Sequence, residues 1–379
     1  MVREHLEVDS APRLSGHASL LAPGATSRSP SPERPPSASP AQPPVRWLVV
    51  VVATQAWWGM QPVMSRWLQT CTHPPVPTLT LMACANAISL LALFAIDLGR
   101  LAYAWYQYET AVLLALPVSE PGWRLPGLND LLPRLRTDVL RPAAWLASAV
   151  LCRALTVMFA TAFTRAGWVM LTGMAAPIFT ALASRMLYEQ ALPHGFVPTV
   201  AALTFGGTLA IVGEGEQAVA GPGAGLTVAD GTGIILGLTS ACCLTLYFFC
   251  IQGTKGVLSG TQILYLTFST LLLVTAPLSL LIDGVRTWRS FATWTAMDVS
   301  VLLAFSIAQY IVGNWLQQVV IRRVGAPLTS AFLAVRLASA TAAAWPVLGE
   351  PVRGVLSWLG LGIVIGGTST YLAAQARRQ

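Results

Sequence analysis

The stretch RAGWVMLTGMAAPIFTALASRMLYEQALPHGFVPTVAALTFGGTLAIVG, residues 165–213, decides the fold of this chain. Its pattern predicts two apolar helices joined by a short polar turn around Glu189. A second stretch, residues 323–373, follows the same plan: RVGAPLTSAFLAVRLASATAAAWPVLGEPVRGVLSWLGLGIVIGGTSTYLA. In both stretches a Glu ends the first helix, and a Gly-Gly-Thr triplet lies late in the second. The triplets begin 366 − 206 = 160 residues apart, which indicates an internal repeat.

The composition is that of a membrane protein. Hydrophobic residues make up 54% of the chain and charged residues 10%, against about 25% charged in a soluble domain. The charges separate apolar runs of roughly 20 residues, the length at which a helix crosses a bilayer. We therefore predict an all-α integral membrane protein with ten transmembrane helices, near residues 47–67, 77–97, 143–163, 168–188, 196–213, 232–252, 261–282, 299–319, 328–348 and 355–375.

The chain divides into a tail and two halves. Residues 1–45 are rich in Pro and Ser, which predicts a disordered tail, and whether it serves as a targeting segment stays open. The first five helices lie within residues 46–214 and the second five within residues 232–375. Because each half has an odd number of helices, the halves enter the membrane from opposite sides. Inverted repeats of this kind are common in transporters.

A long connection, residues 100–142, interrupts the first half and is predicted to be cytosolic. Its part 127–141 alternates Leu with Arg in an amphipathic pattern, which predicts a helix on the membrane surface or an ordered loop. An eleventh span through residues 102–116 is the less favoured alternative, because Glu109 would then lie in the membrane.

The distribution of Lys and Arg predicts that both termini are cytosolic. Of the 23 basic residues, 16 then lie on the cytosolic side, 5 lie on the other side and 2 lie within helices. This bias follows the positive-inside rule. It does not select the membrane, so the plasma membrane, a plastid membrane and the Golgi all stay open.

These features resemble the drug/metabolite transporter superfamily, specifically its EamA-type members, over residues 47–375. The resemblance implies a transporter of small organic solutes built from five plus five helices, and it does not name the solute. The resemblance lies in the ten-helix plan, the Gly-Gly pairs and a set of Trp, Gly and Pro positions. These positions are Trp58-Gly59, Pro62, Pro177 twelve residues before Glu189, Leu348-Gly349-Glu350, and Gly354. The Trp-Gly start and Gly325-Ala326-Pro327 resemble the nodulin-like plant and algal branch in particular.

Two arginines are predicted to lie near the middle of the membrane, Arg153 in the third helix and Arg336 in the ninth. An Arg at that depth costs about 2.5–3.5 kcal/mol on insertion scales, and no Asp or Glu is expected at the same depth. Both arginines are therefore candidates for binding an anionic or carboxylate-bearing solute. The alternative is that each is held by backbone carbonyls or by Gln and Asn. Arg336 is the sharper candidate, because the first repeat has only apolar and small residues around Ala175.

Further candidates are polar or aromatic residues within the predicted helices, which bind a solute or join helices to each other. Glu189 and Glu350 stand at helix-to-helix turns. There they either bond to the start of the next helix or act as a gate by pairing with Arg185 or Arg353. The additional solute-binding candidates are Gln55, Trp58, Asn86, Tyr247, Gln309 and Asn314.

The sequence also predicts what the chain does not do. No Asp, Glu or His is expected in the core of a span, so proton coupling lacks its usual carrier, and exchange or facilitated diffusion is favoured. We found no nucleotide-binding loop, metal-ligand cluster or catalytic triad spacing, so we predict no enzymatic activity, no cofactor and no nucleic-acid partner. The alternatives are a proton-coupled exporter of amino acids or drug-like metabolites, and a non-transporting scaffold or receptor. The expected partners are a small solute and the lipid bilayer, and a homodimer stays open.

Overall fold

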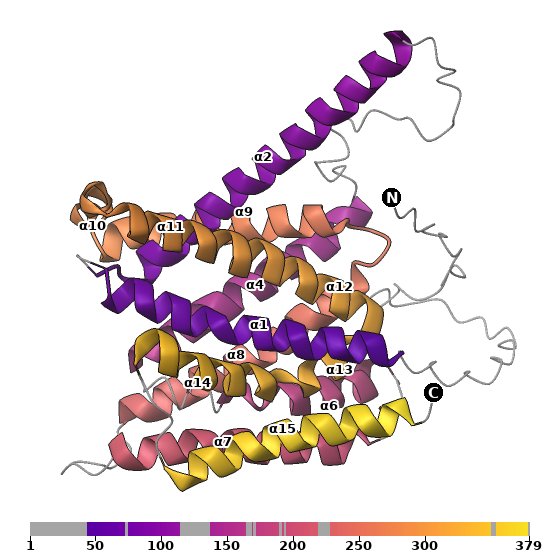
Figure 1. Cartoon of the computed structure of the whole chain (residues 1–379), viewed down its shortest axis with the longest axis vertical. Helices are drawn as coiled ribbons and strands as arrows, with labels where there is room; N and C mark the ends of the chain where they lie inside the picture. Colours follow the sequence, from indigo (N-terminus) through magenta and orange to yellow (C-terminus); the bar gives the residue numbers. More distant parts are fainter. Residues whose placement is uncertain are drawn as a thin grey trace, which may run out of the picture. The chain divides into compact units, whose positions relative to one another are not determined.

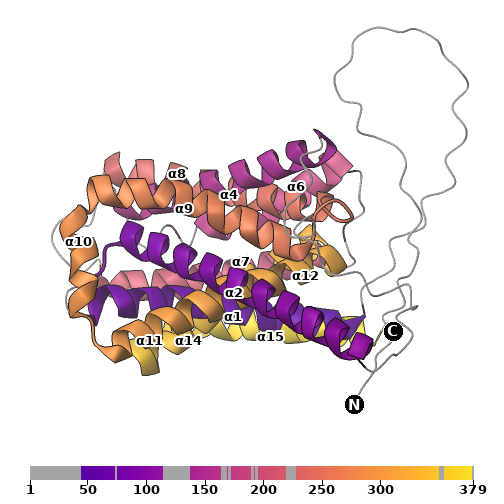
Figure 2. The same ribbon diagram turned by 90° about the horizontal axis from the view of Figure 1, so that it is seen from above.

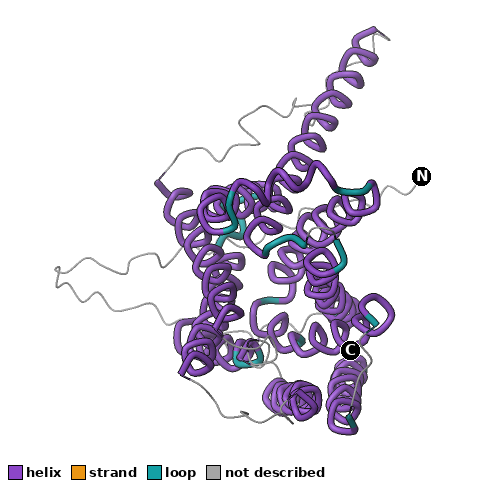
Figure 3. The backbone as a smooth tube through the Cα atoms, turned by 90° about the vertical axis from the view of Figure 1, so that its left-hand side faces the viewer, coloured by secondary structure: helices purple, strands orange, loops and turns teal. Residues whose placement is uncertain are grey.

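The computed structural model describes residues 44–72, 75–113, 137–163, 169, 172–188, 192, 195–218, 228–349 and 354–377. This part of the chain is helical, and no strand occurs within it (Figure 3). The predicted all-α class is thus confirmed for the described residues. Residues Gln42–Gln379 form one compact unit. The tail predicted for residues 1–45 lies almost entirely outside the described residues.

The described helices are labelled in chain order in Figure 1. They are α1 (Val45–Thr70), α2 (Thr78–Leu113), α4 (Thr137–Phe163), α6 (Ala176–Tyr188), α7 (Phe196–Ala218), α8 (Val228–Gly253), α9 (Gly260–Ile282), α10 (Val285–Ser290), the 3-10 turn η1 (Phe291–Thr293), α11 (Ala296–Ala304), the π-helical segment η2 (Phe305–Gly313), α12 (Asn314–Val324), α13 (Ala326–Ala331), α14 (Leu333–Leu348) and α15 (Val355–Ala376).

Seven helical stretches among the described residues are long and apolar enough to cross a membrane, as expected of a multi-pass membrane protein. The apolar part of α7, Phe196–Ala210, is shorter. The seven stretches are Thr78–Tyr103, Val139–Ala160, Gly231–Gly253, Gly260–Ile282, Ala296–Val324, Ala326–Leu348 and Val355–Ala376.

Local sequence sets several helix ends. Ser259 caps α9. Its hydroxyl accepts from the Gln262 backbone N–H at 3.1 Å, and the Gln262 side-chain oxygen accepts from the Ser259 backbone N–H at 2.9 Å. Thr295 and Asp298 form the same capping box at the start of α11. Gly325, with φ of 95°, turns the chain between α12 and α13 in a conformation that other residues rarely adopt.

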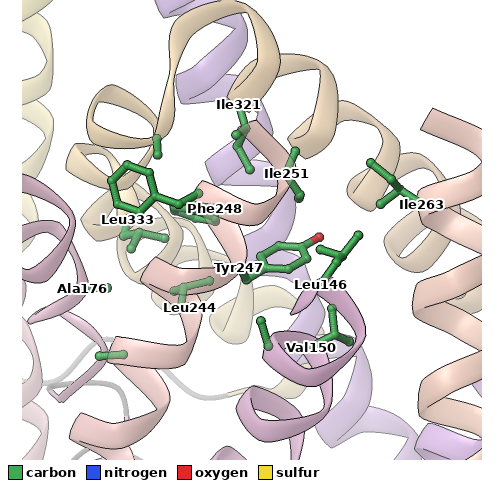
Figure 4. Packing of buried hydrophobic residues seen from close by; sticks show 14 of the residues in the cluster. Leu146, Val150, Ala176, Leu244, Tyr247, Phe248, Ile251, Ile263, Ile321 and Leu333 are labelled. Carbon is green, nitrogen blue, oxygen red and sulfur yellow. The ribbon is translucent and has the colours of Figure 1, made fainter. Parts of the chain in front are cut away.

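The two halves of the chain interlock. The four most extensive helix pairs are α4 with α8, α7 with α15, α1 with α14, and α2 with α9. Each pair joins a helix that ends by residue 218 to one that begins after residue 227 (Figures 1 and 2). Buried apolar side chains fill the contact between α4 and α8, where Leu146 and Val150 lie beside Tyr247 (Figure 4).

The contact between α1 and α14 depends on a glycine. A Cβ atom built on Gly59 would collide with the Ser339 side chain and with the Arg336 carbonyl oxygen, and it would lie 2.9 Å from the Ala340 nitrogen. Glycine therefore allows the two backbones to approach closely, as small residues do in membrane helix pairs. This close approach places the centre of α1 against the first turns of α14.

Two predicted helices differ from the structure, one in where it ends and one in being interrupted. The second span was predicted to end at residue 97, but α2 continues to Leu113, which is 113 − 97 = 16 residues further. No Pro or Gly lies between residues 100 and 113 to end the helix. The fourth span was predicted as one continuous helix over residues 168–188; residues 169, 172 and 173 are helical, but a turn at Met174–Ala175 follows and α6 begins at Ala176. Most of the predicted surface segment 127–141 lies outside the described residues.

Candidate functional site

Arg336 lies in the first turn of α14 and binds a side chain of α1. Its Nε and Nη2 atoms both donate to Oε1 of Gln55, at 3.2 and 2.8 Å. The Gln55 amide in turn donates to the Thr329 carbonyl oxygen at 3.4 Å, and Gln55 is fully buried. The guanidinium group is thus held by a neutral amide. Its positive charge is oriented by this contact and is not neutralised by it.

Trp58 covers the same guanidinium group. The Arg336 Cζ lies 5.1 Å from the centre of the Trp58 ring, within the range of a cation–π interaction. The Trp58 indole donates to the Gly313 carbonyl oxygen at 3.1 Å, so the ring is fixed against the end of η2. An aromatic face and a fixed cation therefore stand side by side.

Arg153 of α4 lies at the same cluster. Its Cζ is 5.7 Å from the centre of the Tyr247 ring of α8, and Tyr247 interacts electrostatically with both Arg153 and Arg336. The two guanidinium groups also act on each other electrostatically. Figure 4 shows Tyr247 with its hydroxyl beside Leu146. Tyr247 thus lies within the fields of two cations from opposite halves of the chain.

Tyr310 of η2 joins this cluster from a further direction. It interacts electrostatically with Arg153 and hydrogen-bonds with the Gln61 side chain. Its ring packs edge-on against Phe305, with ring centres 5.3 Å apart. We call the set Gln55, Trp58, Gln61, Arg153, Tyr247, Tyr310 and Arg336 the central cluster. Its members come from α1, α4, α8, η2 and α14.

The central cluster has no carboxylate among the side chains that the structure describes. The described acidic side chains are Asp97, Asp283 and Asp298. The first accepts from Arg100 and Tyr265, the second from Thr80, and the third caps α11. Each of the three is therefore engaged elsewhere. The two cations come from different helices and have amide and aromatic partners, an arrangement that an anion would complete.

The remaining predicted residues have other partners. The amides of Asn86 and Asn314 donate to backbone carbonyls one turn earlier, at Met82 and Tyr310, both at 2.7 Å. The nearest hydrogen-bonding partner of the Gln309 amide is the Met64 sulfur at 3.9 Å. None of these three shows a contact with Arg153 or Arg336 within the described part of the chain. Glu189 and Glu350, the predicted gating or capping pair, lie outside the described residues.

Some features of the site were not found from the sequence. Asp97 was placed at the end of a span, but it lies inside the apolar stretch Thr78–Tyr103 with 7% of its surface exposed. The Tyr265 hydroxyl donates to it at 2.9 Å. The residues after Asp97 continue α2 to Leu113, and this continuation could have indicated that Asp97 lies within the helix. Among the described residues, no group of three His, Cys, Asp or Glu side chains could hold a metal ion.

No family model and no curated protein matches this chain. The fold is similar to a protein of known crystal structure, with a TM-score of 0.64 and 14% sequence identity. That match covers 88% of this chain and 99% of the other. At this identity the similarity concerns the fold alone.

Proposed function

We propose that this chain transports a small organic anion, in particular a carboxylate, across a membrane by alternating access. The observation that carries this proposal is the pair Arg153 and Arg336, which belong to different halves and have no carboxylate partner among the described side chains. Guanidinium groups bind carboxylates through paired hydrogen bonds. A bound solute would supply the negative charge that the described side chains around the two arginines lack.

The architecture we propose is ten spans in two inverted five-helix repeats, of the drug/metabolite transporter type. Two breaks in the helices support it. A turn at Met174–Ala175 precedes α6, and a turn at Phe332 separates α13 from α14. Their separation, 332 − 174 = 158 residues, is close to the 366 − 206 = 160 residues between the two Gly-Gly-Thr triplets. Broken helices at corresponding positions are typical of transporter binding sites.

Reciprocal contacts between α2 and α9 give a second argument for the inverted repeat. Near one end of the pair, Asp283 accepts from the Thr80 hydroxyl at 2.6 Å. Near the other, Asp97 accepts from the Tyr265 hydroxyl at 2.9 Å. The carboxylates are 283 − 97 = 186 residues apart and the hydroxyls 265 − 80 = 185. A two-fold axis in the membrane plane would repeat one contact as the other on the opposite face.

The charges of the central cluster favour exchange over one-way transport. Like charges in a medium of low dielectric repel each other strongly. The empty site therefore holds two mutually repelling cations, and a bound carboxylate removes that repulsion. The break at Phe332 adds to the effect, because the start of α14 carries a partial positive charge three residues before Arg336. The loaded protein should change conformation more readily than the empty one, which is the requirement for exchange.

The test is counterflow in proteoliposomes. Vesicles that contain the purified protein are loaded with a dicarboxylate or an amino acid, and uptake of the labelled solute is measured. We expect Arg336→Gln and Arg153→Gln each to lower uptake at least about tenfold, one lost charge-assisted contact. Arg289→Gln removes the same charge from the exposed helix α10 and should transport normally. Stabilisation by cationic solutes alone in a thermal-shift screen would contradict the proposal.

The proton-coupled alternative has one observation in its favour, the buried carboxylate of Asp97. Buried carboxylates within spans often carry protons. Asp97→Asn separates the two mechanisms, because anion exchange without a pH gradient should survive it and proton-driven export should not. Flux of any solute by the purified protein would exclude a pure scaffold or receptor.

A further inference from the structure

One face of α12 carries buried polar side chains that nothing in the central cluster uses. Gln317 and Gln318 are 0% and 1% exposed, yet neither the nitrogen nor the oxygen of either amide has a hydrogen-bond partner. One turn later, Arg322 donates from Nη2 to the Leu258 carbonyl oxygen at 2.6 Å, while its Nε has no partner. Asn314, Gln317, Gln318 and Arg322 recur at the spacing of one helix face. We call them the α12 stripe.

The α12 stripe leads from the central cluster to one end of the bundle. At its first residue, the Asn314 amide donates to the Tyr310 carbonyl oxygen at 2.7 Å, and Tyr310 belongs to the central cluster. Further along, Gln318 faces the start of α9, since a Cβ atom on Gly260 would lie 3.5 Å from its Oε1. Figure 1 shows α12 running toward the end of the bundle where α1 begins and α15 ends.

Unpaired buried amides are unfavourable and rare in native proteins. α12 does not need them to fill space, because its neighbouring positions Val320 and Ile321 are fully buried and apolar. The amides have no packing advantage over Leu or Met of similar size. Water or a polar solute that reaches the amides would relieve this cost.

We propose that the α12 stripe lines the route by which the anion reaches the central cluster, and that this route is shut in the present conformation. The proposal rests on the proposed transport function. It assigns a role to Gln317 and Gln318 as donors to the passing solute and its water, and to Arg322 as the cation at the entrance. The pairing of Arg322 with a backbone carbonyl leaves its charge available to attract an anion.

Cysteine labelling tests the route. Gln317→Cys, Gln318→Cys and Val320→Cys are made singly in a variant without the six native cysteines. Each is treated in sealed vesicles with an anionic or a cationic membrane-impermeant methanethiosulfonate. Val320 is the matched control, because it is equally buried on the same helix but packs in an apolar cluster with Leu48 and Leu328. A thiol reacts only where water and reagent reach it.

We expect Gln317→Cys and Gln318→Cys to react at least about tenfold faster than Val320→Cys, and faster with the anionic reagent relative to a free thiol. Equal rates at all three positions, or a preference for the cationic reagent, would overturn the proposal. The labelling is independent of flux, so a labelled route in a protein without transport would reject the transport function and keep the route.

Gln318→Met provides a second measurement if the cysteine variants do not fold. If the amide lines the route, flux should fall about tenfold, the loss of one contact made in transit, and the melting temperature should change little. Unchanged flux with a raised melting temperature would identify the amide as an idle buried group and refute its role.

Discussion

At the scale of single residues, Gln55 determines the charge of the central cluster. It receives two hydrogen bonds from Arg336 and donates one to the Thr329 carbonyl oxygen, so an acid in its place would keep the first two, lose the third and add a negative charge. We predict that Gln55→Glu folds about as stably as the parent, because the ion pair with the guanidinium group offsets the lost hydrogen bond to Thr329. Affinity for the anion should fall about tenfold or more, since the new carboxylate occupies the charge that the solute would meet.

This prediction is measured by the solute-induced shift in melting temperature, compared between the parent, Gln55→Glu and the isosteric Gln55→Met. The methionine removes the acceptor without adding charge, and should be the less stable of the two variants by about 1–3 kcal/mol, the cost of an unpaired buried donor. An undiminished anion response in Gln55→Glu would show that the solute does not bind at Arg336.

Part of this residue-scale arrangement could be predicted from the sequence. Arg153 and Arg336 stood out because an ionised side chain deep in an apolar run has few explanations. The contact of Arg153 with Tyr247, and that of Arg336 with Trp58, depend on how helices from the two halves rotate toward each other. Hydrophobic pattern does not fix that rotation in a membrane, where both faces of a helix can be apolar. Gln309 was a candidate as a polar side chain within a predicted helix, and its amide lies nearest the Met64 sulfur.

At the scale of helices, the approach of α1 to α14 positions both Trp58 and Arg336. We predict that Gly59→Ala weakens this contact and lowers stability by about 1–3 kcal/mol, the usual cost of overpacking. The added methyl group would collide with the Ser339 side chain and the Arg336 carbonyl oxygen. Gly99→Ala is the matched control, because nothing lies within 4 Å of its added Cβ atom, and it should be neutral or slightly stabilising.

Thermal unfolding in detergent measures both variants. If Gly59→Ala proves as stable as Gly99→Ala, the backbones of α1 and α14 do not approach as described. The anion-induced shift in melting temperature is measured for both variants as well. If this shift disappears in Gly59→Ala while the protein still folds, the helix contact sets the geometry of Trp58 against Arg336.

Helices were the part of the fold that the sequence predicted best, because an apolar run of membrane length has few other solutions. The errors concern where helices end and where they are interrupted. The end of α2 is set by the absence of Pro and Gly beyond the membrane. The turn at Met174–Ala175 lies between Gly173 and Pro177, so the sequence held a signal for it, whereas the π-helical geometry of η2 interrupts apolar sequence that contains no Pro or charge. Both irregularities lie within apolar runs predicted as continuous spans, and π-helical segments are frequent at functional sites.

At the scale of the whole molecule, the two halves of the chain pack against each other and are not separate bodies. Each of the four most extensive helix pairs joins one half to the other. Much of the apolar surface of each half is therefore covered by the other, and the central cluster takes residues from both. We therefore expect the two halves to fold together and to share their stability.

We predict that the chain split between α7 and α8 folds only when both pieces are present. Residues 1–220 and 221–379, expressed together with different tags, should copurify and show the anion-dependent thermal shift of the intact protein, because the helix pairs α4 with α8 and α7 with α15 re-form across the cut. Either piece alone should be degraded or aggregate, since its contact surfaces stay unpaired. A single half that purifies with its own cooperative unfolding transition would show that the halves are independent domains, and would move the binding site out of their interface.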